Sequence, residues 1–346
     1  MKCSFEISGR KVGADYPPLV IAEIGINHGG SLDIAIEMAD CAIRHGAEVI
    51  KHQTHVLYDE MSREAEKVVP GNSDKSIDQI IRECALDENS EYLFMQHIRA
   101  RGAIYISTPF SRAAATRLLN FNVPAFKIGS GECSNYPFIQ HIAKLGRPMI
   151  VSTGMHDIEA IRPSVEIMRK SGVKFALLHC TNVYPTPSEL VRLNAIEELR
   201  EAFPDAVIGL SDHSVTNYPC IAAVALGASI LERHFTDSRE RSGPDISCSM
   251  TGEELSELTL AVRTVHSALG SGKKPIAEET PTIAFALASV ATVAPIKAGE
   301  MFTEQNIFPM RPSGGDFGPG DYESLIGRIA AVDLEPRVQL RLGDVE

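Results

Sequence analysis

The sequence predicts a (β/α)₈ barrel followed by a small, mostly β module, and two observations support this. Within the first 235 residues, eight short apolar runs each end in a polar cluster, at intervals that suit a strand, a loop, a helix and the next strand. After residue 270, a stretch of glycine, serine, lysine and proline interrupts the pattern, and shorter alternating runs follow. Parallel barrel strands are buried on both faces, so functional side chains are expected where these strands end.

The eight runs end in clusters that combine polar, charged and small residues. In chain order the clusters are Glu23–His28, Lys51–His55, Ser107–Phe110, Lys127–Glu132, Ser152–Gly154, His179–Asn182, Ser211–His213 and Glu232–His234. One such ending has little significance, but eight in series are typical of the rim of a barrel enzyme, where catalytic residues gather.

The first connection shows the repeating unit. Ser31 is a helix N-cap, apolar residues repeat along one face between Leu32 and Ile43, and Gly46 ends the helix. The next connection, residues 56–76, is a polar stretch with a Pro-Gly-Asn turn at 70–72. It is longer than most connections of this kind, and long rim loops usually close over a substrate.

The boundaries follow from these patterns. We expect residues 1–270 to form the barrel with a short N-terminal hairpin, residues 271–284 to be a linker, and residues 285–346 to form the mostly β module. A module of roughly 60 residues is marginally stable alone. It is therefore expected to lean on the barrel or on a second subunit.

Composition excludes several classes of protein. A net charge of −12 without a basic stripe opposes nucleic-acid binding, although local cations can still hold a small anion. No apolar stretch approaches the roughly 20 residues of a membrane span, and the start does not resemble a signal peptide, so we expect a cytoplasmic protein. Seven cysteines without a Cys-x-x-Cys motif argue against a disulfide framework or a thiolate zinc site. Most are expected to be buried small hydrophobes.

Two histidines end successive predicted strands. His213 and His234 would lie at neighbouring positions of one rim, which predicts a two-histidine site for a divalent metal. Two imidazoles leave coordination positions open for water and substrate, as a catalytic metal requires. The alternative is that either ring hydrogen-bonds a backbone group.

Two lysines end otherwise apolar strands. An ammonium group is not buried without an anion, so Lys51 and Lys127 are predicted to hold an anionic ligand. Further hydroxyl and amide donors at rim positions suit a phosphate or carboxylate, namely Thr108, Ser130, Ser152, Asn182 and Ser211. A Schiff-base lysine is the competing interpretation.

Carboxylates complete the predicted rim. Glu23 or Glu132 could act as a general acid or base, because a carboxylate in a dry cleft can have a raised pKa. The alternative is a salt bridge with one of the two lysines. Asp245, in the loop after the last strand, could orient a sugar hydroxyl or a metal-bound water, or simply belong to a turn.

Several motifs together resemble the bacterial sialic acid synthase family over essentially the whole chain. They are Glu-Ile-Gly-Ile-Asn-His, Lys-His-Gln-Thr-His, Ser-Thr-Pro-Phe-Ser, Phe-Lys-Ile-Gly-Ser-Gly-Glu, His-Cys-Thr-Asn-Val-Tyr-Pro-Thr-Pro and Gly-Leu-Ser-Asp-His-Ser. The tail is similar to the antifreeze-like (SAF) domain of that family at residues 296–300 and 311–317.

The resemblance implies condensation of phosphoenolpyruvate with N-acetylmannosamine, a Mn²⁺ or Mg²⁺ ion and a domain-swapped homodimer. It implies that Glu23 handles protons and that His213 and His234 bind the metal. It assigns phosphoenolpyruvate to Lys51, Thr108, Lys127, Ser130, Ser152, Asn182 and Ser211, and the open-chain sugar to Gln53, Glu132, Tyr184 and Asp245. Arg311 would reach the partner subunit's site and bond the N-acetyl group.

Two other functions stay open. A related diacetamido sugar as acceptor would make the chain a legionaminic- or pseudaminic-type acid synthase, because pocket shape decides between acceptors that differ by one group. A carbohydrate- or ice-binding protein with an inert barrel is the alternative outside enzymes, but it leaves two lysines, two histidines and Glu23 at the rim unexplained.

Overall fold

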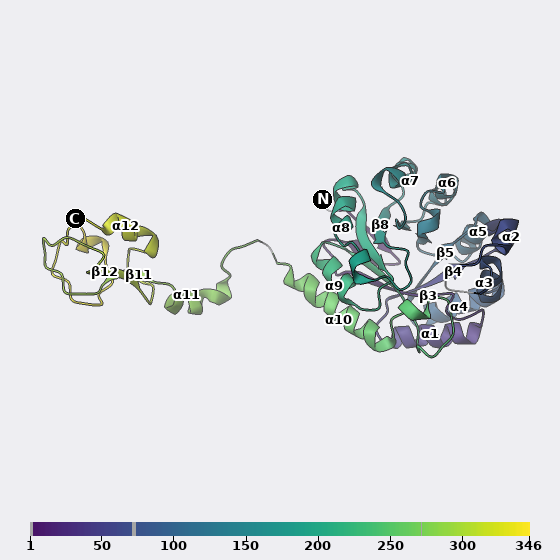
Figure 1. Cartoon of the computed structure of the whole chain (residues 1–346), viewed down its shortest axis with the longest axis horizontal. Coiled ribbons are helices and arrows are strands. Elements are labelled where there is room, and N and C mark those ends of the chain that lie inside the picture. Colours follow the sequence, from purple (N-terminus) through teal and green to yellow (C-terminus); the bar gives the residue numbers. More distant parts are fainter. Residues whose placement is uncertain (1–2, 71–73, 271) are drawn as a thin grey trace. The chain divides into compact units, whose positions relative to one another are not determined.

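A computed structural model describes residues 3–70, 74–270 and 272–346 of the chain. The chain divides into two compact units, Met1–Gly270 and Ser271–Glu346. The first unit contains a closed barrel of eight parallel strands, which confirms the predicted fold class (Figure 1). In chain order the strands are β3 (Leu19–Gly25), β4 (Val49–Thr54), β5 (Ile104–Pro109), β6 (Phe126–Ile128), β7 (Met149–Ser152), β8 (Phe175–Cys180), β9 (Val207–Asp212) and β10 (Ile230–His234).

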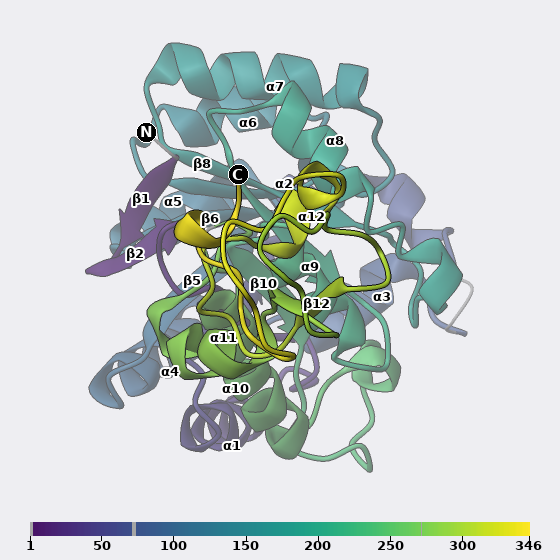
Figure 2. The same ribbon diagram turned by 90° about the vertical axis from the view of Figure 1, so that its left-hand side faces the viewer.

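The barrel closes between its last and first strands, since β10 pairs with β3 in parallel register, His234 opposite Glu23. An N-terminal hairpin of β1 (Ser4–Ile7) and β2 (Arg10–Gly13) precedes it (Figure 2). Phe5 and Ile7 of this hairpin pack into the apolar cluster at the strand starts. Met1 and Lys2, which the predicted hairpin also includes, lie outside the described residues. The apolar end of the barrel is thus covered, and the polar strand ends form the opposite rim.

Helices surround the barrel, and most of them bury their apolar faces against the outer surface of its strands. They are α1 (Leu32–Arg44), α2 (Leu57–Glu60), α3 (Ile77–Cys84), α4 (Glu88–Ala100), α5 (Arg112–Asn120), α6 (Tyr136–Ala143), α7 (Ile158–Ser171), α8 (Ala195–Ala202), α9 (Tyr218–Ala225) and α10 (Gly252–Ala268). Ser31 caps α1, as predicted, because its side chain accepts a hydrogen bond from the backbone N–H of Ile34.

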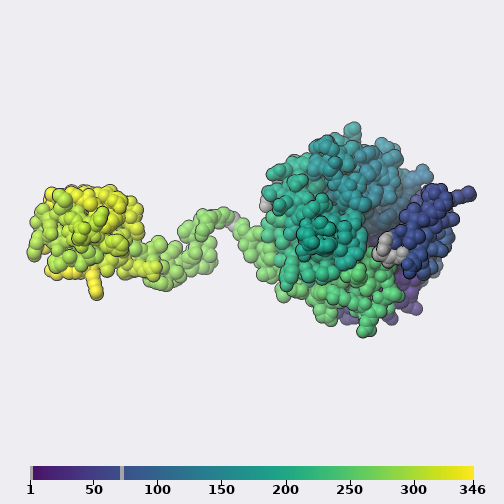
Figure 3. Space-filling model, viewed as in Figure 1, coloured from purple at the N-terminus to yellow at the C-terminus, as the bar shows by residue number. Residues whose placement is uncertain are grey.

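The long connection after β4 is more structured than the sequence indicates. It contains α2 and a 3₁₀ turn at Arg63–Glu66, and its surface bulges from the barrel unit in Figure 3. Residues 71 and 72 of the predicted turn lie outside the described residues. The seven cysteines are free, and six of them are buried, as expected for small apolar side chains.

The second unit has a small core of its own, built from Val290, Phe302, Ile307 and Leu340 among others. Its elements are α11 (Thr280–Ala286), β11 (Ser289–Thr292), β12 (Ile307–Met310) and α12 (Tyr322–Leu325), and β11 pairs antiparallel with β12. The predicted linker is partly helical, because α11 begins within it. In the described part of the chain, no helix is long and apolar enough to cross a membrane.

Candidate active site

A polar cavity of about 160 Å³ lies at the C-terminal ends of the barrel strands. It brings together twelve of the predicted site residues: Glu23, Lys51, Gln53, Thr108, Lys127, Ser130, Ser152, Asn182, Tyr184, Ser211, His213 and His234. Phe110, Gly129, Gly131, Cys180 and Glu232 complete its lining. The strand alternation explains this convergence, since side chains two apart on a strand share a face. Lys51 and Gln53 of β4 accordingly line the cavity together.

Lys51 is anchored by carboxylates. Its Nζ lies 2.7 Å from Glu23 Oε1 and 3.6 Å from Glu232 Oε1, and it donates a hydrogen bond to Thr108 Oγ1 at 3.0 Å. Burial alone would lower the pKa of Lys51, but the two carboxylates outweigh it and raise this pKa. A protonated amine is a poor imine-forming nucleophile, so the geometry favours anion binding by Lys51.

Lys127 is held differently. Its Nζ donates to Ser152 Oγ at 2.6 Å and to the carbonyl of Ile128 at 3.0 Å, while Glu232 Oε1 lies 3.6 Å away. Burial lowers the pKa of Lys127, although Glu232 opposes this change. Burial would raise the pKa of Glu232, but Lys127 and Lys51 outweigh it and the net pKa is lowered. Glu232 is therefore an ionised carboxylate between two lysines.

Two carboxylate oxygens in this cluster lack partners. Glu23 Oε2 and Glu232 Oε2 are buried and accept no hydrogen bond from the described residues. An unsatisfied buried charge is costly, and such groups gather where a ligand or water completes the site. The cavity thus offers cations for an anion and two carboxylate oxygens for donors of a ligand.

The two predicted metal ligands lie together. The ring centroids of His213 and His234 are 5.4 Å apart. His213 Nδ1 donates to the carbonyl of Thr181 at 2.9 Å, which leaves Nε2 with its lone pair. His234 Nδ1 is buried without a hydrogen bond. Burial lowers the pKa of each ring to about 4, so both are neutral, as metal ligands must be.

These observations fit a divalent ion held by two imidazoles. Burial also raises the pKa of Asp245, whose Oδ2 lies 3.6 Å from His234 Nδ1. Among the described residues, however, no group of three histidine, cysteine, aspartate or glutamate side chains has the geometry of a metal centre. The remaining coordination positions would therefore belong to water and substrate.

Contacts of Tyr184 and Asn182 form another part of the cavity wall. The ring of Tyr184 stacks on His213 with centroids 4.1 Å apart, and Asn182 Nδ2 lies 3.4 Å from the Tyr184 hydroxyl. The backbone N–H of Gly154 donates to Ser130 Oγ at 3.1 Å. A Cβ at position 154 would stand 1.8 Å from Asn182 Oδ1, so this close approach requires glycine.

Three predicted residues lie outside the lining of this cavity. Glu132 accepts from Asn135 Nδ2 at 2.7 Å and lines an adjacent cavity that shares Phe110. Its predicted alternative, a salt bridge with Lys51 or Lys127, is wrong, because Glu23 and Glu232 take those positions. Asp245 lies beside His234, as described above. Arg311 belongs to the second unit, directly after β12, and is exposed.

Sequence reasoning missed the role of Glu232 at the centre of the cluster. Its signal was present: Glu232 and His234 are two apart on one strand, so they face the same side. Phe110 was also missed as a lining residue, since a phenylalanine after a strand carries no chemical signal.

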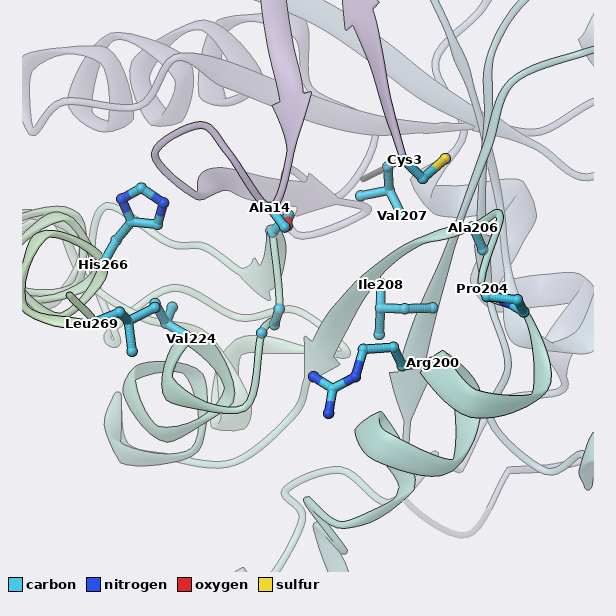
Figure 4. Close-up of a pocket in the computed structure, with 13 residues that line it drawn as sticks. Cys3, Ala14, Arg200, Pro204, Ala206, Val207, Ile208, Val224, His266 and Leu269 are labelled. Atoms are coloured by element: carbon cyan, nitrogen blue, oxygen red, sulfur yellow. The ribbon is translucent and has the colours of Figure 1, made fainter. Parts of the chain in front are cut away.

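A larger cavity, about 330 Å³, lies at the other end of the barrel, and Figure 4 shows its lining. It lies where β9 begins, at Val207 and Ile208, and its polar side chains include Arg200 and His266. Arg200 already donates to the carbonyl of Leu226 at 2.6 Å and to Glu197 at 3.0 Å. This cavity lacks the convergent charges of the rim, so the smaller rim cavity is the candidate active site.

Comparisons with known proteins point to one family. A family model described as the NeuB family matches residues 38–274. The N,N'-diacetyllegionaminic acid synthase of Campylobacter jejuni is 35% identical over 90% of this chain and 95% of the relative. The human N-acetylneuraminate-9-phosphate synthase is 33% identical over 94% of this chain and 92% of its own length.

The chain is also similar to solved structures. An N-acetylneuraminic acid (sialic acid) synthetase from Leptospira borgpetersenii, in complex with citrate, superposes with a TM-score of 0.74 and 29% identity, over 82% of this chain and 96% of that one. The spore coat polysaccharide biosynthesis protein SpsE of Bacillus subtilis covers 99% of both chains with a TM-score of 0.67 and 32% identity.

Proposed function

Since the chain belongs to the NeuB family, whose relatives include synthases of several sialic-acid-type sugars, we propose that it is an N-acetylneuraminate synthase. It condenses phosphoenolpyruvate with N-acetylmannosamine and releases phosphate. The observation that carries this proposal is the buried cluster in which Lys51 and Lys127 face Glu23 and Glu232 inside one rim cavity.

The reaction forms one carbon–carbon bond. C3 of phosphoenolpyruvate attacks the aldehyde carbon of the open-chain sugar, and the aldehyde oxygen takes up a proton. Water then adds to the cationic C2 and gives up a proton. The bond between C2 and the bridging oxygen breaks, so phosphate leaves with that oxygen and a 2-keto acid remains, which closes to the nine-carbon sugar.

The lysines supply the anion-binding part of this chemistry. Phosphoenolpyruvate carries a carboxylate and a phosphate, and we assign them to the buried ammonium groups of Lys51 and Lys127, each of which lies 3.6 Å from Glu232. Thr108 and Ser152 already hydrogen-bond the two ammonium groups, which fixes where these cations lie. Ser130, Asn182 and Ser211 add neutral donors around the same cavity. These groups stabilise the departing phosphate.

A carboxylate serves as proton acceptor and donor in this reaction. Glu23 Oε2 is unpartnered and can accept a proton from the attacking water or return one to the aldehyde oxygen. Gln53 and Tyr184 line the cavity and are the groups we assign to the sugar, with Glu132 and Asp245 at its margins.

His213 and His234 would hold the divalent ion, Mn²⁺ or Mg²⁺. When bound, such an ion polarises the sugar aldehyde toward attack. The chain's own contribution is to present two neutral imidazoles, one oriented by the carbonyl of Thr181.

A diacetamido sugar is the second candidate acceptor. Relatives named as legionaminic and pseudaminic acid synthases are as similar to this chain as the N-acetylneuraminate-9-phosphate synthases. Both candidates use the same phosphoenolpyruvate chemistry, and they differ in the groups that the sugar presents to the mouth of the cavity.

For the C-terminal unit we propose the SAF role that the resemblance implies. Arg311 of one subunit would contact the sugar bound by its partner in a domain-swapped homodimer. The exposure of Arg311 is compatible with such a contact. We also propose a cytoplasmic location, where phosphoenolpyruvate is available.

Competition between acceptors tests the assignment. The purified chain with Mn²⁺ and phosphoenolpyruvate is offered N-acetylmannosamine, its 6-phosphate and 2,4-diacetamido-2,4,6-trideoxymannose at equal concentrations, and products are identified by mass. We expect N-acetylneuraminate to dominate. A dominant diacetamido product would reassign the chain to the legionaminic-type branch, and a 9-phosphate product would contradict the unphosphorylated acceptor.

A further inference from the structure

His55 lies between two hydrogen-bond acceptors. Its Nδ1 is 3.0 Å from both carboxylate oxygens of Glu60, and its Nε2 is 3.3 Å from Gln53 Oε1. The ring is buried and stacks on Phe110, with centroids 4.6 Å apart and planes 11° apart. Carboxylate and carbonyl oxygens only accept hydrogen bonds, so both ring nitrogens must carry protons to satisfy them. An imidazolium paired with Glu60 satisfies both contacts.

The orientation of the Gln53 amide supports this assignment. Gln53 Nε2 donates to Glu23 Oε1 at 2.9 Å, and the same oxygen lies 2.7 Å from Lys51 Nζ. Reversing the amide would bring its oxygen against a carboxylate oxygen of Glu23, so the Glu23 contact alone fixes the orientation. The Glu23 contact thus selects one orientation of the amide, with its oxygen toward His55.

His52, three residues before His55, has different hydrogen-bond partners. The backbone N–H of Gly30 donates to His28 Nδ1 at 3.1 Å, so the His28 proton lies on Nε2 and points at His52 Nε2, 3.1 Å away. His52 then carries its own proton on Nδ1, which faces Glu91 Oε1 at 3.3 Å. His52 thus lies between a donor and an acceptor, unlike His55, which faces two acceptors.

The charges around His55 come from a few elements. Glu60 of α2 is paired directly with the ring, and Gln53 of β4 separates it from the Glu23–Lys51 pair. His28, in the connection after β3, interacts electrostatically with His55 but is neutral, because burial lowers its pKa to about 3. Phe110 contributes an uncharged face. Glu60 is the counter-charge of the imidazolium.

We propose that His55, held as an imidazolium by Glu60, is a positioning residue that fixes the side-chain amide of Gln53 against Glu23. His55 is not part of the cavity lining, whereas Gln53 is, so His55 acts through Gln53. Its kinetic consequence rests on the proposed function, in which Gln53 faces the acceptor sugar. The protonation state of His55 does not depend on the proposed function.

The protonation state is tested first, on the full chain labelled with ¹⁵N-histidine, by magic-angle-spinning NMR at pH 7.5. The His55 signals are assigned by their loss in His55→Asn. We expect both His55 nitrogens to be protonated in the wild type and one to be unprotonated in Glu60→Gln. Asp40→Asn is the matched control, because Asp40 also pairs with a histidine: its Oδ1 lies 2.7 Å from His97 Nε2. This pair lies outside the rim, so the substitution should leave His55 protonated. A neutral His55 in the wild type would overturn the proposal.

Kinetics test the positioning role. Glu60→Gln should lower kcat with the acceptor sugar about 10- to 100-fold with the KM for phosphoenolpyruvate unchanged, as expected for misplacement of one contact group. Glu60→Asp should recover part of the loss. Wild-type activity in correctly folded Glu60→Gln would contradict the role. If no acceptor supports turnover, the proposed function fails while the NMR result still decides the charge of His55.

Discussion

Lys51 and Glu23 are register partners on neighbouring barrel strands, and their side chains form a buried ion pair with 2.7 Å between Nζ and Oε1. Neither side chain is more than 4% exposed, so the pair is shielded from water. Glu23 Oε2 remains unpartnered on the same carboxylate. Under the proposed function, this pair supplies a fixed cation for an anionic substrate and a free oxygen for proton transfer.

Breaking this pair should destabilise the barrel. Lys51→Met leaves Glu23 and Glu232 with an uncompensated buried charge, which typically costs about 3–5 kcal/mol. The double variant Glu23→Gln/Lys51→Met should lose less than the sum of the two single variants. Urea unfolding of the four proteins measures this coupling. Additive losses would show that the two side chains do not interact.

Gly154→Ala should abolish activity while the barrel still folds. Its Cβ would meet Asn182 Oδ1 at 1.8 Å and Ser130 Oγ at 2.9 Å, so two cavity side chains must move. Gly320→Ala, outside the cavity, is the control, because a Cβ there meets nothing within 4 Å. Phosphate release and circular dichroism of both variants check this. Normal activity of Gly154→Ala would contradict the described contact.

The stability of the barrel should fall on the acid side partly through His28. Burial lowers the pKa of this ring from 6.5 to about 3, so the unfolded chain binds a proton between these values that the folded chain does not. Stability from this group is present above pH 6.5 and is lost as pH falls toward 3. In His28→Asn, the slope of the unfolding free energy against pH should decrease in this window by the amount that corresponds to one bound proton. An unchanged slope would show that His28 is protonated in the folded state.

The role proposed for Arg311 predicts a selective kinetic effect. Arg311→Ala should raise the KM for N-acetylmannosamine about tenfold, the effect of one lost hydrogen bond to a charged group, with the KM for phosphoenolpyruvate unchanged. Arg328→Ala, in the same unit, is a control, since Arg328 Nε binds the carbonyl of Glu346. Unchanged kinetics of Arg311→Ala would remove this residue from the site.

Much of the fold and rim could be predicted because periodicity and strand ends are local signals. The alternation Lys51-His52-Gln53 places the first and third residues in the cavity, and sequence is enough to state this. The partners of these side chains are not local. Glu60, the partner of His55, lies in α2, a short helix that the sequence pattern does not predict. Glu91, the partner of His52, lies in α4.

Pairing among charges was the least predictable part. The sequence offers three carboxylates for two lysines, and the barrel closure decides the outcome by setting β10 beside β3. Glu232 then lies between Lys51 and Lys127, while Glu132 turns to Asn135. The partly helical linker was missed for a similar reason, since Pro281 suits the first turn of a helix as well as a loop.

The central claim, phosphoenolpyruvate-dependent condensation with cleavage of the C–O bond, is tested most directly by isotope tracing. The chain is stripped with EDTA, restored with Mn²⁺, and given N-acetylmannosamine and phosphoenolpyruvate labelled with ¹⁸O at the bridging oxygen. We predict phosphate release that depends on both metal and sugar, with the ¹⁸O in the phosphate. Label retained in the sugar acid would contradict C–O cleavage, and no release with any acceptor would contradict the synthase assignment.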